Sequence, residues 1–269
     1  MCKEKTESTK AVVNCQVVEN REIAVGIYKI TIGGESVLPI CKDLAPGQFI
    51  NVYMKDKSTL LPRPISICNI EKDAIELVYK VVGKGTGEMS GYKRGDSIRI
   101  SSPLGNGFRL DADGSEKRAV LVAGGVGVPP MIELAKALKK LGMAVTGVFG
   151  FQEEPFLIRE MEAHCDRLFI ATENGMEGFH GNVIQLMVEQ NITGDEFYSC
   201  GPKPMLKALA LACEEMKVPV QVSLEERMGC GYGACVGCTC RIKEGEKVVQ
   251  KAVCKDGPVF KGNEVVWDE

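Results

Sequence analysis

The feature that most constrains the fold of this chain is a change in its hydrophobic pattern near residue 112. Before that point, short β-rich runs alternate with Gly and Pro breaks, and none keeps a helical apolar stripe for three turns. The runs are AVVNCQVVEN, IAVGIYKITI, GQFINVYM, RPISICNI, AIELVYKVV and DSIRISSP. Short runs of this kind, separated by turn residues, predict six antiparallel strands in a barrel or a sandwich.

The pattern after the polar segment LDADGSEKR is strand, loop and helix in repetition. The buried run AVLVAGG is followed by PPMIELAKALKKLG, whose apolar residues have helical spacing and whose Gly142 marks a helix stop. The alternation continues to PVQVSL, which predicts a doubly wound parallel sheet. The chain therefore divides into an all-β domain, residues 1–112, an α/β domain, residues 113–224, and a tail, residues 225–269.

The tail has too few apolar side chains for a core of its own and holds five of the twelve cysteines. Its stretch MGCGYGACVGCTC places Cys230, Cys235 and Cys238 at the x4, x2 spacing of plant-type [2Fe-2S] ligands. The glycines suit a backbone that curls around a cluster and donates N–H groups to its sulfurs. Zinc is the alternative, because Cys240 lies nearby, but zinc ligands usually come as two knuckle pairs. The spacing favours iron–sulfur.

The fourth ligand is expected to be Cys254. The segment TCRIKEGEKVVQKAVC has the pattern of strand, turn and strand, so a hairpin carries the chain away from the cysteine-rich loop and returns it beside that loop. Cys240 is on the outgoing strand only two residues after Cys238, where a second thiolate would have to bend the strand to reach the same irons. We therefore expect Cys240 to be a packed neighbour.

Two Gly-containing segments follow strands of the predicted sheet. In GGVGVPP, residues 124–130, glycines let the backbone approach a pyrophosphate, and the helix start offers free N–H groups. SCGPKPM places Cys200 and Gly201 at the carboxyl edge of the sheet, where open α/β sheets bind ligands. Glu153 and Glu154 follow the next strand and would repel a 2′-phosphate, which favours NAD over NADP. Each segment alone is also compatible with a tight turn, a structural thiol or solvated acids.

Two segments of the all-β domain offer groups for a phosphate. In LLPRPISI, Arg63 lies between prolines that restrict the backbone, and Ser66 follows two residues after Pro64. In VYKVVGKGTGEM, a Gly-rich turn carries Gly85 and Thr86. By themselves these residues are equally compatible with a surface arginine and a hairpin turn.

Composition and charge exclude several classes of function. The 36 acidic and 33 basic residues give a net charge of −3, with no basic patch for nucleic acid. No apolar run approaches the roughly 20 residues of a membrane helix. The first ten residues lack the apolar core of a secretory signal. We therefore expect a cytoplasmic protein, in which most of the scattered cysteines are small buried hydrophobes.

The motifs RPIS, GKGT, GGVGVPP, CGPKPM and SLEERMGCGYGACVGCTC with VCKDGPVF stand in the order found in the ferredoxin reductase superfamily. From about residue 11 to 267, the chain resembles the electron-transfer subunits of NAD-linked (class 1B) dihydroorotate dehydrogenases. The resemblance implies an FAD-binding antiparallel six-stranded β-barrel over residues 1–112. It also implies an NAD-binding α/β domain over residues 113–224 and a small [2Fe-2S] subdomain over residues 225–269.

The resemblance implies a role for each matching residue. In relatives, the arginine of the R-P-[IL]-S run binds the FAD pyrophosphate and its serine lies near flavin N5. Ser66 and Cys200 are therefore the implied catalytic residues. The implied cofactor contacts are Arg63, Pro64, Ile65, Ser66, Val78, Tyr79, Lys80, Gly85 and Thr86 for FAD, and Gly124, Gly125, Gly127, Cys200 and Gly201 for NAD. The implied cluster ligands are Cys230, Cys235, Cys238 and Cys254.

Electron transfer is the function that the resemblance implies. NAD exchanges two electrons as a hydride and the cluster carries one, so FAD must connect them. The implied partner is an FMN-containing catalytic subunit that oxidises dihydroorotate in pyrimidine biosynthesis, assembled as a heterotetramer of two of each. Electrons would pass from that FMN through the cluster and FAD to NAD+. The alternatives are a related subunit of an NADH-dependent ferredoxin or sulfide reductase, and a zinc-stapled, non-catalytic interaction module.

Overall fold

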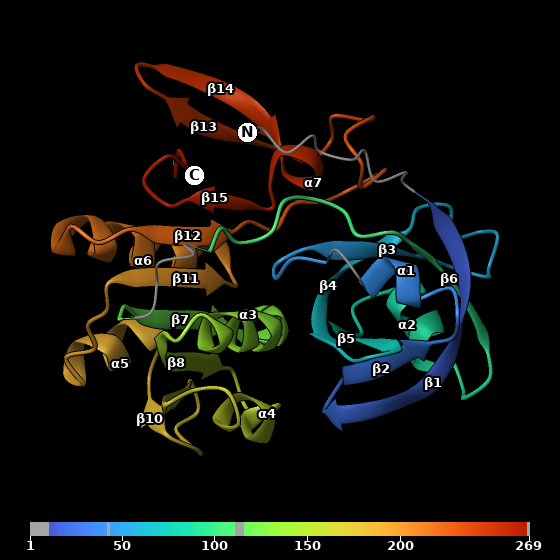
Figure 1. The fold of residues 1–269 in the computed structure, drawn as a ribbon, viewed down its shortest axis with the longest axis horizontal. Coiled ribbons are helices and arrows are strands. Elements are labelled where there is room, and N and C mark those ends of the chain that lie inside the picture. The colour runs from blue at the N-terminus through green and yellow to red at the C-terminus, as the bar shows by residue number, and fades with distance from the viewer. Residues whose placement is uncertain (1–10, 42–43, 111–115, 268–269) are drawn as a thin grey trace.

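A closed antiparallel barrel forms the N-terminal part of the chain (Figure 1). The computed structural model describes residues 11–41, 44–110 and 116–267. The strands close in the order β1-β2-β5-β4-β3-β6, and alternate side chains such as Ile30, Ile50 and Ile100 fill the interior. The strands are β1 Val12–Ala24, β2 Ile27–Gly33, β3 Phe49–Tyr53, β4 Arg63–Ile70, β5 Ala74–Lys80 and β6 Ser97–Ser101. Of the two predicted arrangements, the chain forms the barrel.

Two local features of the barrel differ from the sequence pattern. The run IAVGIYKITI is split by a turn at Gly26, whose φ of +69° suits glycine, so its first residues belong to β1. The predicted Gly-rich turn around Gly85 is the start of a short helix, α2 (Lys84–Ser90). The Thr86 hydroxyl caps this helix by accepting the amides of Val82 and Gly83. A further short helix, α1 (Leu38–Cys41), follows β2.

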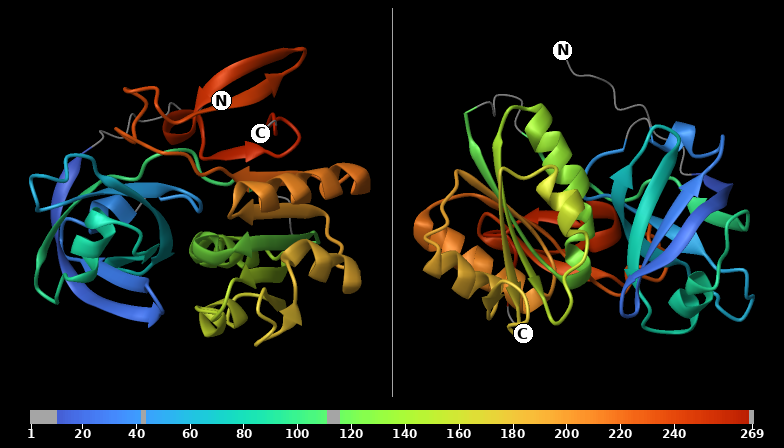
Figure 2. Two further views of the ribbon diagram at one scale, coloured as in Figure 1. Left: turned by 180° about the vertical axis from the view of Figure 1, so that it is seen from behind. Right: turned by 90° about the horizontal axis from the view of Figure 1, so that it is seen from below.

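The α/β part confirms the predicted doubly wound sheet. Its parallel strands are β7 Arg118–Gly124, β8 Ala144–Phe151, β9 Arg167–Thr172, β10 Phe179–His180, β11 Glu196–Cys200 and β12 Val220–Ser223. The helices are η1 Gly125–Gly127, α3 Pro129–Lys140, α4 Ile158–Glu162, α5 Val183–Glu189 and α6 Lys203–Met216. Helices α3 and α4 cover the face turned toward the barrel, and α5 and α6 cover the opposite face (Figure 2).

Helix α3 forms where proline and apolar spacing predict it. Pro129 and Pro130 occupy its first turn, where their missing N–H groups cost no hydrogen bond. Met131, Leu134 and Leu138 are fully buried at the spacing of one helical face. This face packs on the sheet and belongs to the same apolar cluster as Ile27, Cys68, Val78 and Phe108 of the N-terminal part. We call the contact of these four residues with the α/β part the interdomain apolar layer.

The C-terminal segment has no separate core. It forms a hairpin, β13 Thr239–Glu244 and β14 Lys247–Ala252, then α7 Val253–Asp256 and β15 Val259–Lys261. Strand β15 pairs antiparallel with β12 and extends the parallel sheet to the order β10-β9-β8-β7-β11-β12-β15. Ile242, Val253 and Val265 pack in the same buried cluster as Val222 and Leu224. The hairpin therefore lies over the edge of the sheet (Figure 1).

Within the described residues, no helix combines the length and the apolar character needed to cross a membrane.

The buried thiol of Cys213 makes the stability of the fold depend on pH in the alkaline range. Burial raises the pKa of the Cys213 thiol from 9.0 to about 12, so the folded state favours the protonated form. The contribution of this thiol to the free energy of unfolding is complete below about pH 9, and it is lost as the pH rises through the pKa of the folded state. We expect the free energy of unfolding, from urea titrations between pH 8 and 11, to fall less steeply in Cys213→Ala than in the parent. Equal slopes would contradict this.

Candidate functional site

The Gly-rich loop and the Cys200 segment meet at the switch point of the sheet. Strands β7 and β11 are neighbours, and their carboxyl ends place residues 124–127 beside Cys200 and Gly201. A Cβ at Gly201 would lie 3.0 Å from the Gly124 nitrogen, and one at Gly127 would lie 2.5 Å from the Cys200 carbonyl carbon. Gly125 has a φ of +53° and faces open space. A dinucleotide can therefore approach the backbone at this edge.

Gly127 is a position where even one methyl group should be harmful. In Gly127→Ala, the new Cβ would overlap the Cys200 carbonyl group, so the Gly-rich loop and the Cys200 segment must separate. We expect the free energy of unfolding to fall by about 1–3 kcal/mol and NADH to bind more weakly. Chemical unfolding and NADH titration measure both. Gly87→Ala is the matched control, because nothing lies within 4 Å of its Cβ position, and unchanged behaviour of both variants would contradict the account.

Arg63 begins β4 and lies against the start of α2. A Cβ at Gly85 would stand 2.5 Å from Arg63 Cζ, so only glycine lets the guanidinium lie there. Among the described residues, its one hydrogen-bond partner is the Leu61 carbonyl oxygen, which accepts from Nη1 at 2.7 Å. The remaining N–H groups of the fork are available to a phosphate. Two separate segments of the sequence thus form one cradle, whose free guanidinium N–H groups are suited to an anion.

Ser66 lies on the outer face of β4. Its neighbours Ile65 and Ile67 pack in the barrel core, so strand alternation turns Ser66 outward, and Cys68, at a bulge of β4, is fully buried in the interdomain apolar layer. Ser66 is itself only partly buried, and it pairs in register with Phe49 of β3. Pro64 and Ile65, between Arg63 and Ser66, are also partly buried. The predicted flavin residue therefore faces the side on which the α/β part packs.

The remaining predicted FAD contacts are placed less favourably. Val78 is buried in the interdomain apolar layer, and Tyr79 is buried in the barrel, where its hydroxyl donates to Asn20 Oδ1 at 3.2 Å. Lys80 is exposed. The Thr86 hydroxyl accepts from the Val82 and Gly83 amides at 3.0 and 3.3 Å, so it orders the turn. A cofactor would meet the backbone of Val78 and Tyr79 rather than their side chains.

Cys200 has a neutral thiol. Desolvation raises its pKa to about 12, and the hydrogen bond from Ser223 opposes this only in part. The protonated form therefore dominates near neutral pH. Cys200 is suited to pack against a nicotinamide ring, and it is not suited to act as a base.

The four predicted cluster ligands gather as two pairs. Cys230 hydrogen-bonds to the side chain of Cys235, and Cys254 to that of Cys238. Cys238 and Cys254 are buried, whereas Cys235 is exposed. The described residues contain no group of three His, Cys, Asp or Glu arranged around a single metal ion. Two thiol pairs, with three cysteines on the loop before β13 and the fourth on α7, are the donor set that a cluster of two irons requires.

Backbone N–H groups point at the sulfurs of these cysteines. Cys230 Sγ accepts from the amides of Tyr232, Ala234 and Cys235 at 3.5, 3.2 and 3.4 Å, and Cys254 Sγ accepts from that of Gly233 at 3.1 Å. Desolvation alone would raise the pKa of the Cys230 thiol, but these bonds lower it to about 6. A loop that stabilises thiolate before metal binds is suited to an iron–sulfur cluster.

The backbone of this loop is strained at one position. Val236 has a φ of +53°, a conformation that costs a β-branched residue about 1–3 kcal/mol. The neighbouring Gly231 and Gly233 have φ values of +78° and +89°, which glycine adopts without cost. The loop therefore curls tightly between Cys230 and Cys238.

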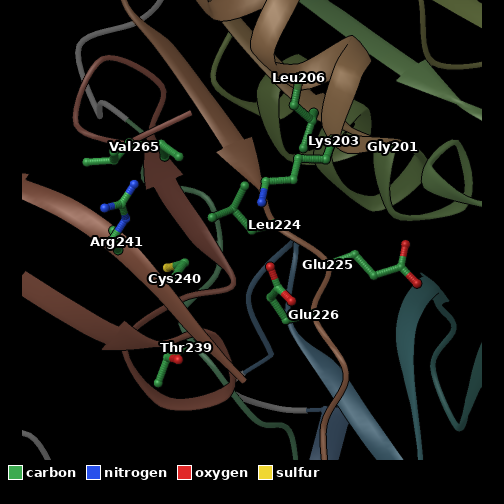
Figure 3. Close-up of a pocket in the computed structure, with 11 residues that line it drawn as sticks. Gly201, Lys203, Leu206, Leu224, Glu225, Glu226, Thr239, Cys240, Arg241 and Val265 are labelled. Carbon is green, nitrogen blue, oxygen red and sulfur yellow. The ribbon is translucent and has the colours of Figure 1, made fainter. Parts of the chain in front are cut away.

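Cys240 lines a cavity of about 360 Å³ (Figure 3). The cavity lies between the start of α6 and the hairpin, where Lys203, Glu226 and Arg241 also line it. Desolvation, together with the charge of Glu226, raises the pKa of Cys240 to about 11. Cys240 thus lies beside this cavity and packs against the buried cluster that also contains Cys238, and its exclusion from the cluster ligands stays a prediction.

Two asparagines that the sequence analysis missed attach this segment to the barrel. Asn51 Nδ2 donates to the Cys230 carbonyl oxygen at 2.9 Å, and Asn106 Nδ2 donates to the carbonyl oxygens of Lys255 and Asp256 at 3.0 Å. Asn51 is buried within the apolar run FINVYM. The signal in the sequence that could have identified Asn51 is its position as a lone polar residue in an apolar strand, because a buried amide needs a hydrogen-bond partner.

The geometry fits the groups that the sequence implies. The thiol pairs and their N–H donors suit a [2Fe-2S] cluster, the Arg63–Gly85 cradle suits the FAD pyrophosphate, and the switch point suits a dinucleotide. The cluster loop is fixed to β3 of the barrel, which is the strand paired with β4. Cys230 is therefore tied to the barrel strand next to the one that begins with Arg63.

Comparisons with known proteins agree with this arrangement. A family model described as the iron-sulfur cluster binding domain of dihydroorotate dehydrogenase B matches residues 225–266. The dihydroorotate dehydrogenase B (NAD(+)) electron transfer subunit of Geobacillus sp. (strain WCH70) is 46% identical over 254 residues, which cover 93% of this chain and 96% of that protein. The same-named subunit of Listeria innocua serovar 6a is 42% identical over 93% of this chain and 97% of that protein.

A solved structure extends the comparison to the fold. A chain of NADH-dependent reduced ferredoxin-NADP oxidoreductase, whose structure concerns flavin-based electron bifurcation, has a TM-score of 0.83 and 31% identity. The match covers 94% of this chain and 90% of that chain. With nearly complete coverage at these identities, the chain belongs to the family of electron transfer subunits of dihydroorotate dehydrogenase B (NAD(+)).

Proposed function

We propose that this chain carries electrons from the FMN of a dihydroorotate-oxidising catalytic subunit through a [2Fe-2S] cluster and FAD to NAD+. The observation that carries the proposal is the attachment of residues 230–238, which we call the thiol loop, through Asn51 to β3, the strand paired with the one that carries Arg63 and Ser66. We retain residues 1–112, 113–224 and 225–269 as the proposed FAD, NAD and [2Fe-2S] regions. FAD supplies the link between one-electron and two-electron chemistry when bound.

The residues of the chain divide the work of binding and orientation. Arg63 and the Gly85 turn would hold the FAD pyrophosphate, and Ser66 would donate its hydroxyl near the flavin ring. Gly124, Gly125 and Gly127 would receive the NAD pyrophosphate, with Gly201 and the neutral thiol of Cys200 beside the nicotinamide. Cys230, Cys235, Cys238 and Cys254 would be the cluster ligands. No residue is required to take up or release a proton as an acid or base catalyst.

We place the partner over the exposed side of the thiol loop. Cys235 is exposed, and two apolar side chains beside it, Tyr232 and Val236, are 48% and 65% exposed. Exposed aromatic and apolar residues around a redox centre suit a protein interface. Belonging to a family of electron transfer subunits implies a catalytic partner subunit; FMN in that partner and a heterotetramer of two of each remain our proposal. We also propose a cytoplasmic location, because the described cysteines form no disulfide.

Reconstitution tests this function. The chain and an FMN-containing dihydroorotate dehydrogenase catalytic subunit should co-purify, and the complex should form orotate from dihydroorotate while reducing NAD+. Neither protein alone should couple the two reactions. The proposal would be contradicted if the catalytic subunit alone oxidised dihydroorotate with NAD+ at the same rate as the complex.

A ferredoxin-linked reductase is the second candidate, because one relative at 31% identity is an NADH-dependent reduced ferredoxin-NADP oxidoreductase. Reduction of added ferredoxin by NADH, without any catalytic partner, would favour it. The zinc-stapled module is disfavoured by the match of residues 225–266 to an iron-sulfur family model.

A further inference from the structure

The barrel and the α/β part meet through buried charges as well as through the interdomain apolar layer. Lys29 of β2 is only 8% exposed, and its Nζ lies 3.3 Å from Glu76 Oε1 and 3.6 Å from Glu160 Oε1. Glu76 belongs to β5 of the barrel, whereas Glu160 belongs to α4. The Lys29–Glu160 contact therefore crosses the boundary between the two parts.

A second set of contacts crosses the same boundary from α3. Glu133 Oε2 accepts the backbone N–H of Ile70 in β4 at 3.1 Å and lies 3.6 Å from Lys136 Nζ. Lys136 Nζ donates to Asn69 Oδ1, and Asn69 Nδ2 donates to Glu76 Oε2 at 3.0 Å. Glu76 is thus shared by both sets. We call the continuous system of Lys29, Glu76, Glu160, Asn69, Lys136, Glu133 and the Ile70 amide the interdomain network.

The network is placed to fix α3 and the Gly-rich loop against the barrel. Helix α3 starts two residues after Gly127, so holding α3 also holds the loop at the switch point. Its barrel anchors, Asn69 and Ile70, lie on β4, the strand that begins with Arg63 and carries Ser66. Partly buried charges attract each other more strongly than exposed ones, and removing one member leaves its partner uncompensated. Two separate crossings also oppose rotation of one part on the other.

We propose that the interdomain network consists of positioning residues for hydride transfer between FAD and NAD. The network keeps the nucleotide loop at a fixed distance from the flavin face of the barrel, although none of its side chains belongs to the predicted cofactor sites. This inference rests on the proposed function, because it requires FAD on the barrel and NAD at the switch point. A misplacement of about 1 Å can reduce the rate of a positioned reaction roughly 100-fold, so small rotations matter.

Glu160→Gln and Glu133→Gln test the proposal in the complete protein. Each removes one crossing charge, and Glu160 is 39% exposed, which limits damage to folding. We expect flavin reduction by NADH, followed anaerobically by stopped-flow absorption, to slow by up to about tenfold in each variant. In the double variant, the factor by which flavin reduction slows should exceed the product of the factors in the two single variants, because both crossings hold the same boundary. The matched control is Glu244→Gln, which removes the charge pair with Lys251 inside the hairpin.

Further measurements separate a positioning role from general damage to the fold. At a temperature where thermal unfolding shows each variant to be fully folded, the FAD content and the rate of electron exchange between flavin and cluster should stay at parental values. Amide hydrogen exchange at Ile70 should become faster in Glu160→Gln, because opening at one crossing loosens the other. Parental rates of flavin reduction in both variants, or a parallel loss of stability and flavin, would overturn the inference. A parent protein whose flavin NADH does not reduce would instead refute the proposed function.

Discussion

Replacing Cys254 with serine should remove the iron–sulfur cluster, whereas replacing Cys240 with serine should leave it in place. Cys254 is buried, and it hydrogen-bonds to the Cys238 side chain. Its sulfur also accepts a hydrogen bond from the Gly233 amide, so it lies beside the thiol loop. Cys240 belongs to β13 and lines a cavity. Serine at 254 would offer a hydroxyl that is poorly ionised at neutral pH, and one of the two irons would lose a ligand.

Iron analysis and visible absorption after purification measure this difference. The parent and Cys240→Ser should carry about two irons per chain, and Cys254→Ser should lose most of its iron and the broad absorption of the cluster. The two variants make the same chemical change, one in the hairpin strand β13 and one in α7 directly after the hairpin, so each is the control for the other. Loss of the cluster in Cys240→Ser with retention in Cys254→Ser would refute the ligand assignment.

Arg63→Ala should strip FAD from the protein. The guanidinium is held against Gly85 with most of its donors available, and a charge-assisted hydrogen bond contributes about 1.5–3 kcal/mol. The dissociation constant for FAD should therefore rise about 10- to 150-fold. Flavin fluorescence titration of the apoprotein measures it. Gly85→Val should also raise the dissociation constant for FAD, because the valine side chain would displace the Arg63 guanidinium.

Arg118→Ala is the matched control for the arginine change. Arg118 pairs with Asp195 on the exposed surface of the α/β part, at 3.0 Å from Nη2 to Oδ1. FAD affinity should not change in this variant. Parental FAD affinity in Arg63→Ala would show that the cradle does not bind the pyrophosphate.

Periodicity predicts the elements that have a strong local pattern. Strand β6 and the first half of β1 alternate buried residues with more exposed ones, and α3 repeats its apolar residues at helical spacing, so these elements follow from local patterns. The return of Cys254 to the thiol loop also follows from a local pattern, because a hairpin is determined by its turn. Helix α2 was missed because KGTGEMS has weak helix propensity, and the capping by Thr86 outweighs it.

Contacts between distant segments carry no such pattern. Strand β15 has only three residues, and its pairing with β12 depends on where the hairpin comes to lie on the sheet. The interdomain network joins residues of β2, β4 and β5 to residues of α3 and α4, and each of them resembles an ordinary surface charge in the sequence. Arg63 and Gly85 were predicted individually, whereas their mutual contact required the closed barrel.

Anaerobic titration of the purified chain with NADH tests the central claim most directly. If FAD connects NAD with the cluster inside this chain, NADH should bleach the flavin band and the cluster absorption together. Full reduction should take about 1.5 NADH per chain, because flavin accepts two electrons and the cluster one. Bleaching of the flavin alone, with the cluster still reducible by dithionite, would contradict the claim.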